Sequence, residues 1–154
     1  MTALQGYLTE LVVAKRKEPT DDLLSDITTG DLTDEELSNI GTLLLGAGLD
    51  TTANMIALGM FALFTNPGQL ALLRDEPDLV DQAVEELMRY LTIAHTGART
   101  AVEDVELSGE VIRAGETVTL SLMTGNRDPD RFPDPDVLDI TREGGGQLGF
   151  GHGV

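Results

Sequence analysis

The sequence contains no cysteine and few cations, and each shortage excludes a class of protein. Without cysteine, these 154 residues cannot form disulfides, zinc fingers, iron–sulfur sites or a thiol nucleophile. Ten lysines and arginines stand against 27 aspartates and glutamates, a formal net charge of −17 at pH 7. Long-range repulsion therefore disfavours a nucleic-acid partner or an anionic membrane surface. The remaining composition, with 41% hydrophobic residues, predicts a soluble globular protein.

The sequence also lacks the features of a secreted or membrane protein. Residues 1–11 do not show a basic region followed by an apolar one, so we expect a cytoplasmic protein. The one long apolar stretch, residues 40–64, is interrupted by Asp50, Thr51, Thr52 and Asn54, which would be costly in hydrocarbon. We therefore predict a buried helix and no membrane association.

Apolar spacing and helix breakers predict a series of helices before residue 92. The longest begins at Thr33, which has the spacing of a capping box with Glu36, and runs through Phe64. It is apolar on most sides of its second half, so we expect other elements of a larger domain to surround it. The other predicted helices cover residues 4–17, a short segment ending at 26, 67–74 and 78–91.

After residue 98 the pattern changes to alternation. Three short strands are predicted at residues 105–107, 111–112 and 117–122, forming one small antiparallel sheet. Residues 126–142 are dense in aspartate and proline, and residues 144–153 are rich in glycine, so both are expected to be irregular. The predicted fold class is mainly α with a small antiparallel β-sheet, in a single domain.

The long helix has an unusual polar step at residues 47–52, Ala-Gly-Leu-Asp-Thr-Thr. A glycine inside a helix costs about 1 kcal/mol relative to alanine, and a carboxylate among apolar residues is costly unless it is hydrogen-bonded or used. Two interpretations remain open from this window. Gly46 and Gly48 can allow close helix packing while Asp50 reaches solvent, or a distorted helix can leave room for a ligand beside an acid and a hydroxyl.

Other local patterns carry little weight alone. Glu86 and Arg89 lie three residues apart on one helical face, and such pairs are usually weak surface contacts. The glycines of residues 144–149 match a dinucleotide fingerprint, but no strand precedes them and no predicted helix follows. The aspartates of residues 128–136 lack the spacing of an EF-hand loop. Two histidines are too few for a zinc site without carboxylates.

Several motifs nevertheless occur in one order along the chain. They are Ala-Gly-Leu-Asp-Thr-Thr (47–52), Glu86-Leu-Met-Arg89, Gly-Ala-Arg99 before short strands, Asn126-Arg-Asp-Pro, Phe132-Pro-Asp-Pro, Leu138-Asp-Ile-Thr-Arg142 and Phe150-Gly-His-Gly153. In this order they resemble the cytochrome P450 family in its soluble bacterial form. The resemblance implies a partial cytochrome P450 domain over residues 1–154, truncated at both ends, with a long distal helix, a Glu-x-x-Arg helix, a β region and an irregular meander.

The resemblance assigns the polar step of the long helix a catalytic role. Asp50 and Thr51 match the family's acid–alcohol pair, which passes protons to dioxygen during catalysis. Ala47 and Gly48 match the point where this helix opens over the oxygen site.

The cofactor implied by the resemblance is haem b, iron protoporphyrin IX. Arg99 falls where the family commonly has a cation for a haem propionate, and a guanidinium can bond a carboxylate bidentately. Phe150, Gly151 and His152 match the start of the haem-binding loop. The axial cysteine of the family falls roughly three residues beyond Val154, so no residue of the chain is expected to ligate the metal.

A third group implied by the resemblance is structural. Glu86 and Arg89 match the family's Glu-x-x-Arg pair, and Arg142 is the expected third member of a buried salt-bridged cluster. This cluster would hold the loop beneath the haem without taking part in catalysis.

The activity implied is that of a haem-thiolate monooxygenase, an oxidoreductase that inserts one atom of O2 into a small organic substrate. Ile93, Ala94 and His95 resemble its substrate-facing segment, and the electrons are expected from a redox partner, usually a ferredoxin and its reductase. Without the axial cysteine, we expect the chain to be inactive alone. The alternative hypothesis is a non-catalytic gene remnant or truncated product, whose long helix would expose apolar surface and aggregate.

Overall fold

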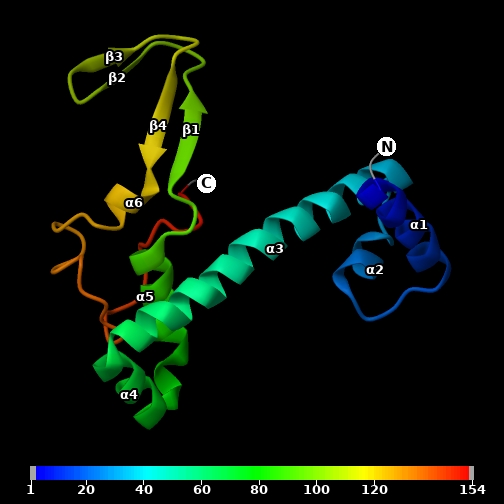
Figure 1. Ribbon diagram of the computed structural model, residues 1–154. Coiled ribbons are helices and arrows are strands. Elements are labelled where there is room, and N and C mark those ends of the chain that lie inside the picture. Colours follow the sequence, from blue (N-terminus) through cyan, green and yellow to red (C-terminus); the bar gives the residue numbers. More distant parts are fainter. Residues whose placement is uncertain (1–2, 153–154) are drawn as a thin grey trace. The chain divides into compact units, whose positions relative to one another are not determined.

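The structure is a computed structural model that describes residues 3–152. It divides into two compact units, Met1–Thr52 and Ala53–Val154, which are described one at a time. The helix α3 (Asp34–Thr65) begins in the first unit and ends in the second. Helices account for most of the chain up to residue 91, and short strands, one short helix and irregular segments follow them (Figure 1). The fold class is mainly α with small antiparallel sheets, as predicted.

The first unit contains α1 (Ala3–Lys17), α2 (Leu23–Ile27) and the start of α3. Asp22 caps α2, because its carboxylate accepts the backbone N–H of Ser25 at 2.9 Å. The helices α1 and α3 lie close together, since a Cβ at Gly41 would meet a methyl carbon of Leu8 at 3.4 Å. The buried apolar side chains of this unit are Leu8, Val12 and Leu37.

The predicted capping box is present at the start of α3. The backbone N–H of Thr33 donates to Oε2 of Glu36 at 2.8 Å, and the backbone N–H of Glu36 donates to Oγ1 of Thr33 at 3.2 Å. The bonds from the backbone and hydroxyl of Thr33 lower the pKa of the Glu36 carboxyl. Arg16 contacts the same region, because its Nε lies 2.7 Å from Oδ1 of Asp34.

Most apolar side chains of α3 are exposed, which corrects the prediction of a buried helix. The two ends of the helix are covered separately, with Leu37 in the core of the first unit and Leu63 in that of the second. By length and composition alone, α3 is also sufficient to cross a membrane. Its exposed large apolar residues are Leu43, Leu44, Leu45, Leu49, Ile56, Leu58, Met60, Phe61 and Phe64.

The second unit continues with α4 (Pro67–Asp75), a 3-10 turn η1 (Pro77–Leu79) and α5 (Val80–Leu91). Pro67 occupies the first turn of α4, where its missing N–H removes no helical bond. The helix α5 ends at Thr92, whose φ of 43° lies in the left-handed region. The core of this unit comprises Ala62, Leu63, Ala83, Leu87, Leu138 and Ile140.

Two separate two-stranded antiparallel sheets follow α5. In one, β1 (Thr96–Thr100) pairs with β4 (Thr117–Ser121), and the two strands run side by side (Figure 1). In the other, β2 (Val105–Leu107) pairs with β3 (Glu110–Ile112). The residues that join β2 to β3, 108 and 109, both have positive φ angles, which a tight hairpin turn requires.

The prediction of a single three-stranded sheet is therefore wrong. It missed β1, because Thr-Gly-Ala-Arg-Thr shows no apolar alternation and takes its strand form from pairing with β4. The strand β4 also ends one residue earlier than predicted, at Ser121, because Ser121 is the N-cap of α6 (Leu122–Gly125). From Asn126 to His152 the described chain has no helix or strand, as predicted.

Candidate functional site

Glu86 and Arg89 form a buried bidentate ion pair on α5. Nε of Arg89 lies 2.7 Å from Oε2 of Glu86, and Nη2 lies 2.8 Å from Oε1. The two side chains are only 1% and 2% exposed. Because burial removes both charges from water, each depends on the other for compensation.

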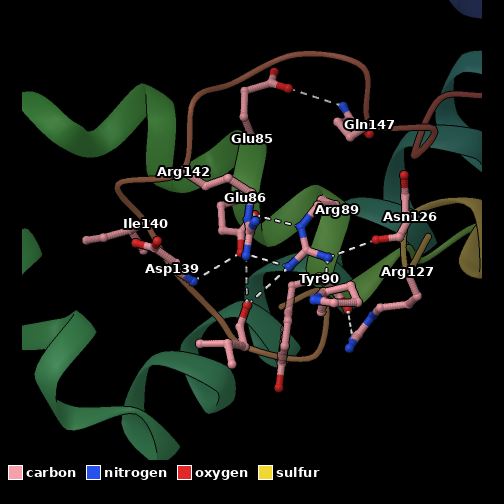
Figure 2. A network of polar contacts seen from close by, with 12 residues as sticks. Glu85, Glu86, Arg89, Tyr90, Asn126, Arg127, Asp139, Ile140, Arg142 and Gln147 are labelled. Atoms are coloured by element: carbon pink, nitrogen blue, oxygen red, sulfur yellow. Dashed lines mark hydrogen bonds and ion pairs between the residues drawn. The ribbon is translucent and has the colours of Figure 1, made fainter. Parts of the chain in front are cut away.

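Arg142 joins this pair from the irregular segment that follows the sheets (Figure 2). Its Nε lies 3.2 Å from Oε2 of Glu86, and its Nη1 donates to the carbonyl of Pro133 at 2.8 Å. The backbone N–H of Asp139 donates to the other carboxylate oxygen of Glu86 at 3.0 Å. The structure thus brings together Glu86, Arg89 and Arg142, the three residues expected to form one cluster.

Arg89 also binds the backbone of the irregular segment. Nη1 donates to the carbonyl oxygens of Asn126 and Pro135, both at 2.8 Å, and Nη2 donates to that of Val137 at 3.2 Å. The guanidinium lies over the ring of Phe132, 5.4 Å from its centroid. A single side chain from α5 therefore holds carbonyl groups spread from residue 126 to 137.

Two glutamines that the sequence did not single out hold the next part of this segment. Oε1 of Gln69 accepts the N–H of Ile140 at 2.8 Å, and Nε2 of Gln82 donates to the carbonyls of Thr141 and Arg142, both at 2.8 Å. No local pattern marks these glutamines, because their partners lie far along the chain.

Asp139 has a lowered pKa in the same segment. The main cause is the hydrogen bond from the Thr141 hydroxyl at 2.6 Å, with smaller contributions from the Thr141 N–H and the Arg142 guanidinium. This carboxylate is therefore ionised around neutral pH and fixes the turn that precedes Arg142.

A hollow of about 310 Å³ lies where β1 and β4 meet the C-terminal loop. It collects most of the residues expected to bind the cofactor, together with one expected to face the substrate. Ile93 and His95 are absent from its lining, and Gly153 of the loop motif lies outside the described residues. The lining residues are Ala94, Gly97, Arg99, Leu120, Leu122, Gly149, Phe150, Gly151 and His152.

The chemistry of this lining fits the edge and face of a haem. Arg99 is exposed, and its Nη1 donates to the neighbouring carbonyl of Ala98 at 2.9 Å, so a guanidinium is available near the hollow for a carboxylate. Phe150 is 87% exposed and offers an aromatic ring for a flat apolar group. The lining contains no thiolate, because the chain has no cysteine. Within residues 3–152, no three acidic or histidine side chains are grouped to hold a metal ion.

Asp50 and Thr51 lie on an exposed part of α3. Oγ1 of Thr51 donates to the carbonyl of Ala47 at 2.7 Å, one turn earlier. The helix is continuous through this stretch, so the expected opening at Ala47 and Gly48 is not a break in the helix. A Cβ at Gly48 would meet no atom of the described residues within 4 Å outside its own stretch of α3.

Known proteins match this chain over nearly its whole length. The family described as Cytochrome P450 matches residues 8–142. Cytochrome P450 105C1 from Streptomyces sp is 52% identical over 155 residues, which cover 99% of this chain and 41% of the relative. Cytochrome P450 monooxygenase PikC from Streptomyces venezuelae is 46% identical over 161 residues, covering 100% of this chain and 39% of PikC.

A solved structure also matches this chain over nearly its whole length. Streptomyces peucetius CYP105P2, in complex with a biphenyl compound, superposes with a TM-score of 0.93 at 44% identity, covering 97% of this chain and 40% of the other. The chain therefore spans about two fifths of the length of the relatives it matches. Because the family match and the relatives extend over nearly all of its residues, this chain belongs to the cytochrome P450 family.

Proposed function

We propose that this chain forms part of a haem-thiolate monooxygenase with haem b as its cofactor. The observation that carries the proposal is the hollow lined by both Arg99 and Phe150, a cation and an aromatic ring contributed by distant segments. The monooxygenase name of PikC supports the reaction class. When bound, a haem with a thiolate ligand supplies the activation of O2 for insertion of one oxygen atom into an organic substrate.

Within this site, Arg99 would bind a haem propionate, and Phe150, Gly151 and His152 would cover the macrocycle. The exposed guanidinium on β1 supports the first role, because it can offer two parallel N–H donors to a carboxylate. Glu86, Arg89 and Arg142 would hold the irregular segment in place. The burial of Glu86 and Arg89, and the absence of all three residues from the lining of the hollow, support a structural role.

Asp50 and Thr51 would deliver protons to the site of O2 reduction. The hydroxyl of Thr51 donates to Ala47, which leaves its lone pairs able to accept a proton donor. Asp50, the residue before Thr51, is exposed, so its carboxylate can pass protons between solvent and the Thr51 hydroxyl. Ala47 and Gly48 would leave space on this turn of α3 for O2.

The proposed partners are a small organic substrate, O2, and a ferredoxin with its reductase. The biphenyl compound bound to CYP105P2 supports an organic substrate, for which Ile93, Ala94 and His95 would line the approach. The net charge of −17 supports the absence of a nucleic-acid partner. We infer a cytoplasmic protein in which further polypeptide, rather than a membrane, covers α3. The polar residues Asp50, Thr51, Thr52 and Asn54 in the middle of α3 support this inference.

A chimera tests the proposed function. This chain replaces the matched 39% of PikC, so that the remainder of PikC supplies the rest of the fold. We expect the reduced, carbon-monoxide-treated chimera to show a thiolate-type Soret band, as PikC itself does in the control. A chimera with the circular dichroism of PikC but without this band would contradict the proposal.

The same chimera tests the proton-delivery residues. Thr51→Ala removes the hydroxyl, and we expect the fraction of consumed O2 that appears in product to fall by roughly tenfold. The matched control is Thr51→Ser, which keeps the hydroxyl and should retain most of the coupling. Equal coupling in both variants would argue against a role for Thr51 in proton transfer.

A further inference from the structure

Asn126 is fully buried, and its four polar groups are all hydrogen-bonded, two of them to residues at the end of α5. Its Nδ2 donates to Oγ1 of Thr92 at 2.8 Å, and its Oδ1 accepts the backbone N–H of Leu148 at 2.7 Å. Its carbonyl accepts Nη1 of Arg89 at 2.8 Å, and its N–H donates to the carbonyl of Leu122 at 2.9 Å. The residue therefore connects the end of α5, the start of α6 and the C-terminal loop.

The hydrogen-bond chemistry fixes the orientation of the Asn126 amide. The single hydroxyl proton of Thr92 is donated to the carbonyl of Arg89 at 2.7 Å, so Oγ1 must accept from Asn126. The backbone N–H of Leu148 can only donate, so it must face the amide oxygen. A side-chain amide supplies both the donor and the acceptor that this arrangement needs.

The two side-chain partners of Asn126 adjoin the two segments that line the hollow. Thr92 lies two residues before Ala94, and the chain continues into β1 with Arg99. Leu148 precedes Phe150, and the N–H of Gly151 donates to the Leu148 carbonyl at 2.8 Å, which closes the turn that carries Phe150.

Packing independently places Leu148 against α6. A Cβ at Gly125 would lie 2.7 Å from Cδ1 of Leu148, so only glycine lets the leucine side chain lie there. Oδ1 of Asn126 and the gap at Gly125 therefore hold the backbone and side chain of the same residue. Both contacts act on Leu148, the first residue of the turn that bears Phe150.

We propose that Asn126 is a positioning residue of the haem site. Its amide sets the separation between the segment that leads to Arg99 and the turn that carries Phe150. The proposal rests on the proposed function, because it requires that the hollow between them receives haem. It predicts that loss of the amide loosens the C-terminal loop before it affects the core of the second unit.

Hydrogen exchange on the full 154-residue chain tests the positioning itself. In Asn126→Ala, we expect the Leu148 amide to exchange at least about tenfold faster, because its acceptor is lost. Thr92→Val should raise the Leu148 exchange rate by a smaller factor. Thr92→Ser, which keeps the hydroxyl, should leave that rate unchanged. The control Ile140→Val weakens the core without touching Asn126 and should not change Leu148 selectively. An unchanged Leu148 rate in Asn126→Ala would overturn the proposal.

Haem dissociation from the PikC chimera tests the link to the cofactor. We expect Asn126→Ala to speed haem transfer to an acceptor protein by about tenfold, with Thr92→Ser close to the unsubstituted chimera. Faster Leu148 exchange with an unchanged haem dissociation rate would overturn the role of Asn126 in the haem site. Failure of the unsubstituted chimera to bind haem would instead contradict the proposed function, whatever the exchange data show.

Discussion

Buried charge is concentrated at Glu86, whose two carboxylate oxygens face Arg89, Arg142 and the Asp139 amide. The adjacent Glu85 has an equally ordinary helical spacing to Arg89, but it accepts a hydrogen bond from Gln147 at 3.3 Å instead. The two side chains leave α5 on different sides, so they have different partners. One carboxylate points into the second unit, and the other lies nearer its surface.

Glu86→Gln should therefore destabilise the second unit strongly. The substitution keeps the shape but leaves Arg89 buried without a counter-charge, which costs about 3–5 kcal/mol. The matched control, Glu85→Gln, should change the free energy of unfolding by less than about 1 kcal/mol. Urea unfolding followed by circular dichroism measures both variants. Equal losses would mean that the buried ion pair does not hold this unit together.

At the scale of elements, the N-terminus of α3 should be sensitive to acid. The pKa of Glu36 is lowered in the folded chain by the Thr33 bonds, so its contribution to stability is complete above its ordinary pKa of 4.5. That contribution is lost as the pH falls through the lower, folded pKa. Stability of the first unit should therefore decline as the pH falls below about 4.5.

Glu36→Gln tests this dependence, because the amide oxygen can still accept the Thr33 N–H but has no acid titration. Urea unfolding across the acid range should show a flatter pH profile for this variant. Glu35→Gln is the control, since it removes the same charge from the same turn outside the capping box. An equally flattened profile in the control would point to general charge repulsion instead of the cap.

Elements with local signals could be predicted from the sequence, and those formed by distant partners could not. The capping box, Pro67 and the apolar stripe of α5 all act within a few residues, and they marked the helices well. The strand β1 depends on its pairing with β4, whose first residue lies 17 positions beyond Thr100. The fold class was therefore predictable, while the sheet topology was not.

The same distinction holds for the candidate site. Motif order, which does not depend on local propensity, selected Arg99, Phe150 and the Glu86 cluster. The structure places the first two in one hollow and joins Glu86 to Arg89 and Arg142. Motif order did not select the side-chain role of Asn126, whose partners Thr92 and Leu148 lie 34 and 22 residues away. The residues next to Asn126 in the sequence do not indicate which distant residues its side-chain amide binds.

For the whole molecule, the large negative charge and the exposed apolar surface of α3 have opposite effects on association between copies of the chain. The net charge of −17 keeps copies of the chain apart through long-range repulsion. Leu49 and Ile56, at 69% and 64% exposure, belong to an apolar surface of α3 that favours contact. At 0.1 M salt, repulsion between charges more than about 10 Å apart is largely screened, while the apolar attraction stays in place.

The isolated 154-residue chain should therefore self-associate, and more strongly as salt is raised. Leu49→Glu with Ile56→Glu should shift the sedimentation velocity distribution toward monomer, because each removed contact contributes about 1.5–3 kcal/mol when buried. Val102→Glu is the matched control, since Val102 is 94% exposed but lies outside α3. A monomeric chain at all salt concentrations, or an equal shift in the control, would show that the apolar surface of α3 does not drive association.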